Sequence, residues 1–393
     1  RLSLRVATGY TGNINKTVKP NLMMKYYKNF RISDDENYRM GYINNAPNPK
    51  LRWEKTRDVK VALDFGLWKD RINGIVEAYW RKSKDCVTSE YVPVTTGFFN
   101  QSYNTSVLQN NGVEFSLSVA VLKSKDYNLS VSANVAWNQN KLKKYNSPNT
   151  SLALDKYVGY PMGAVFSGKY EGIDPETGMY KFKLRPDAVT NKDGYLREPN
   201  NYYYYLGTSV APFTGGFNLN FSYKNIGLSV GGSYSVKAKM VDNIESPAGY
   251  ELLSGSKLES IPTPHNDLYR NHLNVKREVR NRWTPENRTG VKYPRLIDAY
   301  GKKLGLDLTN PTLTTITRGA LLEDISYLRI NTIALSYSLP QRVLERINFS
   351  SAALNLTLNN FFTITKYSGI DPEVPGATYP VSRSVTIGLN VGF

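Results

Sequence analysis

Val385-Thr386-Ile387-Gly388-Leu389-Asn390-Val391-Gly392-Phe393 is the stretch of sequence that decides the fold. Apolar residues occupy every second position, and threonine, glycine and asparagine stand between them. Successive side chains of a β-strand point to opposite faces, so the stretch predicts a strand with one apolar face and one small, polar face. A half-buried strand of a soluble protein has the same period. The aromatic residue at its end and the small polar face favour the closing strand of an outer-membrane β-barrel.

The same alternation recurs along the chain and predicts ten strands. Two residues, Arg329 and Asn331, interrupt the least regular of them, and the most regular form a hairpin around the turn at 124–126. Charged side chains placed regularly on one face, such as Glu77 and Arg81, indicate a water-filled interior rather than a packed sandwich. The expected strands cover 1–11, 51–66, 72–87, 113–121, 129–138, 217–223, 228–235, 325–338, 354–359 and 385–393.

The connectors between these strands alternate between short and long. The short ones are 67–71, 124–126, 225–226 and 339–350, the last with helical spacing of Val343, Leu344 and Ile347 that predicts a short amphipathic turn. The long ones, expected to be loops, are 12–50, 88–108, 141–210, 241–324 and 365–381. This alternation is typical of an antiparallel barrel with one periplasmic and one extracellular rim. Because more than half of the chain lies in the long connectors, we expect recognition to take place outside the cell.

The composition narrows the class of protein. Lysine and arginine total 50 against 33 acidic residues, a net charge of +17, but they are scattered through loops without a nucleic-acid-binding signature, so we expect no nucleic acid partner. An anionic ligand or lipopolysaccharide is weakly favoured. The 29 tyrosines suit an interfacial aromatic belt or, alternatively, a tyrosine-rich soluble extracellular β-protein such as an adhesin. No run of about 18 apolar residues is present, which excludes a helical membrane protein.

Few residues in the sequence suit catalysis or metal binding. Cys86 is the only cysteine, and His265 and His272 lie in no catalytic or ligand pattern, so we predict no catalytic residues, no metal and no cofactor. An Asp-Pro motif occurs twice, over 170–178 and 367–376. Its aspartate is expected to cap its own turn, although paired carboxylates are also compatible with calcium.

Aromatic residues in the long connectors are the candidate substrate contacts. Exposed rings stack on sugars or hold apolar peptide side chains. The alternative is that they pack the loops together or belong to the rim belt. The candidates are Phe98, Phe99, Tyr202, Tyr203, Tyr204 and Trp283, with Tyr205 next to them in the tyrosine run.

A series of short motifs along nearly the whole chain resembles the SusC/RagA family of TonB-dependent outer-membrane transporters. The motifs follow the order of the family, so the resemblance is specific for the family but not for the cargo. They are Asn48-Pro49-Lys50-Leu51-Arg52-Trp53-Glu54-Lys55-Thr56, Leu63-Asp64-Phe65-Gly66, Asn111-Gly112-Val113-Glu114-Phe115, Gly172-Ile173-Asp174-Pro175-Glu176-Thr177-Gly178, Phe213-Thr214-Gly215-Gly216-Phe217, Arg282-Trp283-Thr284-Pro285-Glu286-Asn287, Tyr327-Leu328-Arg329-Ile330 and Asn359-Asn360-Phe361-Phe362-Thr363-Ile364-Thr365.

The resemblance implies an all-β, transmembrane antiparallel barrel of about 22 strands around an N-terminal plug, in the bacterial outer membrane. Residues 1–393 would supply about ten C-terminal strands, and the plug and N-terminal strands would lie outside this chain. The chain opens within a strand and without a signal peptide, which agrees with a piece of something longer.

The implied function is import of a nutrient, an oligosaccharide or a peptide, by a transporter and not an enzyme. The implied partners are a SusD-like surface lipoprotein, TonB through the missing N-terminal region, and outer-membrane lipid and lipopolysaccharide. An alternative is a SusC-like barrel kept as a scaffold subunit in a larger outer-membrane complex.

Overall fold

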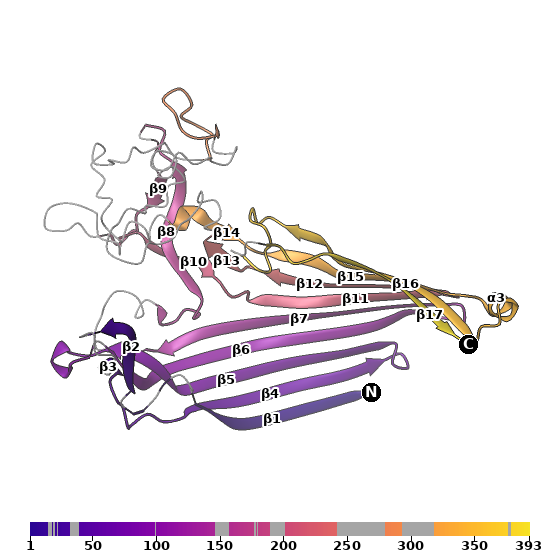
Figure 1. Ribbon diagram of the computed structural model, residues 1–393, viewed down its shortest axis with the longest axis horizontal. Helices are drawn as coiled ribbons and strands as arrows, with labels where there is room; N and C mark the ends of the chain where they lie inside the picture. The colour runs from indigo at the N-terminus through magenta and orange to yellow at the C-terminus, as the bar shows by residue number, and fades with distance from the viewer. Residues whose placement is uncertain are drawn as a thin grey trace. The chain divides into compact units, whose positions relative to one another are not determined.

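A ten-stranded antiparallel sheet dominates the computed structural model (Figure 1). The structure describes residues 1–14, 18, 20–21, 23–31, 39–98, 100–145, 157–176, 178, 180–188, 201–241, 280–292, 318–375 and 379–393. Sheet order, with bounds, is β1 (Leu2–Asn13), β4 (Glu54–Leu67), β5 (Ile72–Tyr91), β6 (Asn100–Lys123), β7 (Tyr127–Lys144), β11 (Phe213–Tyr223), β12 (Ile226–Val236), β15 (Tyr327–Ser338), β16 (Ser351–Thr365) and β17 (Ser384–Gly392).

These strands are the ten that the alternation predicts, in the same chain order. The short connectors are confirmed too, including α3 (Gln341–Arg346), the expected amphipathic turn, whose Leu344 is buried. Within the described residues, no helix has the length and apolarity needed to cross a membrane.

The chain divides into two compact units. One comprises Arg1–Met162 and Gly215–Ser222, and the other Gly163–Thr214 and Tyr223–Phe393.

In the first unit, strand register puts the apolar residues on one face of the sheet. A continuous row of cross-strand partners runs through Leu4, Leu63, Val76, Phe115 and Val135. Leucine and valine on this face are widely exposed, with Leu4 at 67% and Leu63 at 37%. An exposed apolar sheet face of this kind is what a lipid-facing barrel wall requires.

The opposite face of the same strands carries paired charges. Arg5 Nε lies 2.6 Å from Asp64 Oδ2, and Lys60 Nζ lies 3.1 Å from Glu77 Oε1. These ion pairs are partly exposed, so each contributes little stability, but they show a wettable face. The expected division into an apolar outer face and a polar inner face is therefore confirmed.

The second unit repeats this division. Leu228, Leu335, Leu356 and Ile387 are partners along one row. The neighbouring row on the other face consists of small or polar residues, Ser229, Ala334, Thr357 and Thr386. The stretch at 385–393 thus lies against β16 with its apolar residues on the outer face.

The expected loop over 88–108 is wrong for most of its length, because β5 continues to Tyr91 and β6 begins at Asn100. The hydroxyls of Thr88 and Thr105 hydrogen-bond across this extension at 2.8 Å. Polar residues occupy both faces of this extension. The backbone pairing of β5 with β6 therefore continues, but the alternation of apolar and polar residues that marks a membrane-spanning strand does not.

The other long connectors also contain structure that the alternation does not reveal. The additional elements are β2 (Met23–Arg31) paired with β3 (Arg39–Asn45), the sheet β10 (Tyr203–Thr208), β8 (Ala164–Ile173) and β9 (Tyr180–Lys183), β13 (Lys239–Val241) paired with β14 (Leu322–Asp324), and the 3₁₀ turns η1 (Val94–Thr96) and η6 (Arg318–Leu321).

Candidate functional site

The candidate site lies in the long connectors of the second unit, where two groups of residues give the rim a defined structure. One is a polar cluster at the start of β15 and the loop that follows β16. The other is the sheet β10-β8-β9 and the segments that contact it. Binding residues lie disproportionately on loops that a rigid scaffold positions, and these connectors are such loops.

A β-bulge sets the direction of Arg329 on β15. The register with β12 shifts between Ile330 and Thr332, so Asn331 is the extra residue relative to β12. The register with β16 shifts at the same place, where β16 has two residues, Asn360 and Phe361, against Asn331. Asn360 on the neighbouring strand adopts a positive φ of 59° at the same place. A bulge reverses the alternation that follows it, so Leu328 faces outward and Arg329 inward. The residues that seem to interrupt this strand in the sequence are therefore the ones that position the charge.

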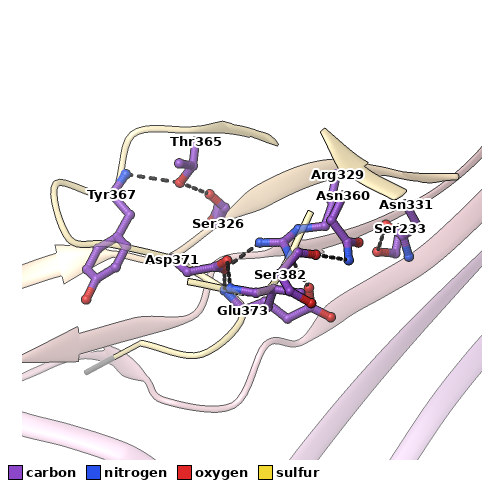
Figure 2. A network of polar contacts seen from close by, with 11 residues as sticks. Ser233, Ser326, Arg329, Asn331, Asn360, Thr365, Tyr367, Asp371, Glu373 and Ser382 are labelled. Atoms are coloured by element: carbon purple, nitrogen blue, oxygen red, sulfur yellow. Dashed lines mark hydrogen bonds and ion pairs between the residues drawn. The ribbon is translucent and has the colours of Figure 1, made fainter. Parts of the chain in front are cut away.

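Arg329 is 1% exposed and ion-paired with two carboxylates (Figure 2). Its Nη2 donates a hydrogen bond to Asp371, and Nη1 lies 3.1 Å from Glu373 Oε2. The Nη1 contact is not aligned as a hydrogen bond. Because a buried guanidinium is costly without compensating charge, these carboxylates fix the loop after β16 against β15.

Asp371 also organises the turn around itself. Its Oδ1 accepts the backbone N–H of Glu373 at 2.9 Å, and its Oδ2 accepts that of Val381 at 3.1 Å. Burial raises the pKa of this carboxyl, but the two backbone donors and the Arg329 guanidinium outweigh burial and hold the pKa below its ordinary value. The expected turn in the second Asp-Pro motif is confirmed, and its carboxylate is occupied by protein donors.

Two further contacts hold the start of this loop. Tyr367 is 6% exposed and packs in a small core with Ala238 and Ile325. Ser368 donates from its backbone N–H and its hydroxyl to the carboxylate of Glu323, which lies in β14 opposite Met240 of β13. The loop is therefore anchored at its beginning and again at Asp371.

The first Asp-Pro motif forms the corresponding turn after β8. Asp174 Oδ1 accepts the N–H of Glu176 at 2.8 Å, as the motif predicts. Trp283 docks on this turn, because its Nε1 donates to the carbonyl oxygen of Pro175 at 2.9 Å and the residue is only 8% exposed. For Trp283, this geometry favours the alternative in which the ring packs loops together.

The tyrosine run contributes to β10. Tyr203 and Tyr204 lie in this strand, which pairs with β8, and the Tyr204 hydroxyl donates to the carbonyl of Leu184 at 2.8 Å. Tyr202 precedes the strand and is half-buried, and burial raises the pKa of its hydroxyl. Three of the candidates therefore lie on or next to segments that contact β8 and its turn. Tyr203 is in β10, which pairs with β8, Tyr202 directly precedes β10, and Trp283 contacts the turn after β8.

Phe98 belongs to the first unit, whereas Tyr202, Tyr203, Tyr204 and Trp283 belong to the second. It is half-buried and follows η1, with its backbone N–H donating to Thr96 Oγ1 at 3.3 Å. Gly97 before it adopts a φ of 78°, where a side chain is unfavourable. Phe99 lies outside the described residues, as do His265 and His272.

β8 and β9 carry an aromatic cluster that the alternation of the sequence does not predict. The ring centroids of Tyr170 and Tyr180 lie 5.6 Å apart, and those of Tyr170 and Phe182 lie 6.1 Å apart. Tyr170 is still 36% exposed, and burial raises the pKa of its hydroxyl. Exposed Lys169 lies directly opposite exposed Lys183. A strand of four residues is too short for alternation to be distinguished from a loop, which explains the omission.

This arrangement is suited to binding. Among the residues that the structure describes, no group of three or more histidine, cysteine, aspartate or glutamate side chains is placed to hold a metal ion. What the rim offers is ring surface, backbone hydrogen-bonding groups and lysines on loops that are fixed by buried contacts. Such a surface recognises sugars and peptides by stacking and polar contacts.

Comparison with known proteins supports the architecture. No protein-family model matches the chain. It is 25% identical over 386 residues to TonB-dependent receptor P26 of Formosa agariphila, covering 89% of this chain and 36% of the relative. It is also 25% identical over 373 residues to TonB-dependent receptor SusC of Bacteroides thetaiotaomicron, covering 88% of this chain and 33% of SusC. The chain thus spans about a third of the length of these curated relatives.

A solved structure of the RagAB peptide transporter matches the whole chain. The TM-score is 0.75 at 26% identity, covering 100% of this chain and 41% of that chain. The RagAB peptide importer in its closed-closed state gives a TM-score of 0.76 at 25% identity. Together with the two-faced sheet and the alternating connectors, these matches show that the chain is a portion of the β-barrel of a SusC/RagA-family TonB-dependent receptor of the bacterial outer membrane.

Proposed function

We propose that the receptor of which this chain is a part imports a nutrient, an oligosaccharide or a peptide, across the outer membrane. The observation that carries the proposal is the match of the whole chain to the RagAB peptide transporter. The charged inner face and the structured long-connector rim support it, since an importer needs a wet interior and a surface that captures cargo. Its relatives are receptors and transporters, and we propose no catalytic role.

We further propose that residues 1–393 supply only part of the barrel, with the plug and the remaining strands elsewhere in the protein. A barrel wall with open edges leaves backbone hydrogen-bonding groups unpaired in lipid, so further strands are required. TonB would act through the plug region, and a SusD-like lipoprotein would cover the long-connector rim. The anchored loops after β8 and β16 support this, because fixed loops offer a partner a preformed surface.

Within the rim, we assign cargo contact first to Tyr170, which is exposed, and to Phe182, which is half-buried and contacts the Tyr170 ring. Phe98, Tyr202 and Tyr203 are half-buried and remain candidates for the same role, as does Phe99. Tyr204 and Trp283 also remain candidates, although the hydrogen bonds that they donate to backbone carbonyls support a role in fixing the loops.

The test is uptake by a strain that lacks the full-length receptor. Labelled peptides and oligosaccharides are offered to the parent, the deletion strain and the strain complemented with the receptor. Uptake that needs both the receptor and TonB supports the proposal. Unchanged uptake with loss of an outer-membrane complex would establish the scaffold alternative.

Affinity purification of the full-length receptor from native membranes tests the partner. We expect a SusD-like lipoprotein to be recovered in equal amount.

A Tyr170→Ala, Phe182→Ala variant is expected to import more slowly than the parent. Trp68→Ala is the matched control, because Trp68 is 76% exposed but lies in a short connector at the opposite rim.

A further inference from the structure

The outer face of β4 and β5 carries four cations in two directly opposed pairs. Register places Lys55 opposite Lys84 and Arg57 opposite Lys82. All four are exposed. They share a face with the opposed pair Val59 and Trp80, which belongs to the apolar wall of the first unit.

Opposed like charges destabilise a sheet. Directly opposite side chains have Cβ atoms about 5 Å apart, and alternate residues of a strand are about 7 Å apart, so the four charges form a compact square. Within the described chain, none of the four forms an ion pair. From Ile72 to the bulge that follows Lys84, the outward positions of β5 and those of β1 and β4 contain no acidic residue. Asp85 in the bulge is paired with Arg52 at 2.7 Å.

The inner face of the same strands shows that this imbalance is confined to one side. There each cation has a carboxylate, as in Lys60 with Glu77 and Arg81 with Asp58, whose closest atoms lie 3.6 Å apart. The outer square therefore lacks a partner from this part of the protein. A polyvalent anion from the surroundings would remove the repulsion.

The position along the strands identifies the surroundings. Trp80 is 49% exposed and Tyr10 is 77% exposed directly beside the square, and the Arg57 guanidinium lies 6.0 Å from the centre of the Tyr10 ring. From Ile72 to Trp80 the strand rises by roughly 27 Å, or roughly 20 Å of depth at a tilt of about 40°. The square thus begins where the apolar band ends, at the rim of the long connectors.

We propose that Lys55, Arg57, Lys82 and Lys84 bind the phosphate groups of lipid A, the glycolipid anchor of lipopolysaccharide in the outer leaflet. A phosphate monoester carries nearly two negative charges, accepts a bidentate contact from arginine and accommodates several lysines. Acyl chains below the phosphates would cover the exposed apolar face. This site rests on the proposed orientation, with the long connectors outside the cell, and not on the cargo, so it stands or falls independently of import.

The experiment uses the full-length receptor in detergent and lipid A with and without its phosphates. Parent receptor is expected to bind phosphorylated lipid A at least tenfold more tightly than the dephosphorylated form. The Lys82→Gln, Lys84→Gln variant is expected to lose that preference. Lys123→Gln, Lys125→Gln removes the same charge at the opposite rim and is expected to bind as the parent does.

Thermal unfolding gives a second readout that does not depend on a binding assay. Without lipid A, the Lys82→Gln, Lys84→Gln variant should unfold at the parent's temperature or higher, because repulsion has been removed. Adding lipid A should raise the unfolding temperature of the parent by more than it raises that of the variant. Equal binding of both lipid A forms by the parent, or equal lipid A stabilisation of parent and variant, would overturn the proposal.

Discussion

At the scale of single residues, Arg329 shows how a rim loop is held in place. A guanidinium that is 1% exposed needs carboxylate partners, and Asp371 and Glu373 both come from the loop after β16. If the loop detached, Arg329 would lose both carboxylates and become exposed to water. The loop therefore leaves β15 only when these ion pairs break. The position of this loop is therefore set by electrostatics as well as by the packing of Tyr367.

Asp371→Asn should loosen the loop without unfolding the barrel. The amide keeps an acceptor for the turn but loses the charge that pairs with Arg329, a contact worth roughly 1.5–3 kcal/mol. Amide hydrogen exchange over 367–375 is expected to rise about tenfold or more. Asp174→Asn in the other motif is the matched control and should change exchange little. Equal effects in the two motifs would contradict the role given to Arg329.

The same loop should resist mild acid. Because Asp371 has a pKa below its ordinary value in the folded protein, its stabilising contribution is complete above the ordinary pKa of about 3.9. It is lost only as pH falls through the lower, folded value. Exchange over 367–375, corrected for intrinsic rates, should stay low at pH 5 and rise below about pH 4. A rise centred above pH 5 would show that another group controls the loop.

Gly319→Ala tests the docking of η6 on β8. A Cβ at this position would overlap the backbone carbonyl oxygen of Gly168, which cannot move aside as a side chain can. We expect faster exchange in β8 and in η6. Gly9→Ala is the control, because a Cβ at Gly9 would meet nothing within 4 Å. Similar exchange in both variants would show that the close backbone approach is unimportant.

At the scale of elements, the alternation of side chains between the two faces of a strand decides which substitutions each position tolerates. Phe115 and Ser116 are neighbours on β6, but Phe115 lies in the row of Val76 and Val135, whereas Ser116 pairs with Ile75 and Asn134. Side chains on the first row face lipid and those on the second face the interior.

Phe115→Arg should therefore be much more harmful than Ser116→Arg. An arginine on the lipid face near the bilayer midplane costs about 2–4 kcal/mol, whereas an arginine on the wet face remains hydrated. Refolding of the full-length receptor into lipid vesicles, followed over a urea series, measures the difference. A larger loss for Ser116→Arg would show that the faces are assigned the wrong way round.

At the scale of the whole molecule, connector length separates the two rims. The described short connectors are turns and α3, while the long ones carry the smaller sheets. Surface labelling of cells identifies which of the two rims is extracellular.

A single cysteine at Val94, 78% exposed in a long connector, should react with a membrane-impermeant maleimide on intact cells. A cysteine at Asp126, in a short connector, should react only after the outer membrane is permeabilised. Both variants need Cys86→Ser, since Cys86 is a free thiol. Labelling of Asp126→Cys on intact cells would reverse the proposed orientation.

Membrane-spanning strands are the part of this protein that its sequence reveals. Alternation predicts all ten strands of the large sheet and their order along the chain, because one face must be apolar and the other wettable along every strand. It misses β8, β9 and β10 and the ends of β5 and β6, because strands outside the membrane need not have one apolar and one wettable face, and β9 and β10 are also short.

The candidate site shows the same limit. Sequence identifies both Asp-Pro turns, since an aspartate caps its own backbone within a few residues. It does not show that Arg329 meets Asp371, a contact between residues 42 positions apart.

Local chemistry therefore determined the strands, the turns and the family of this protein. The tertiary structure decided which charges are paired, as at Arg329, and which are opposed, as at Lys55 and Lys84. The physical reason is that pairing depends on strand register and on a bulge of one residue, which shift the partners of every side chain beyond them.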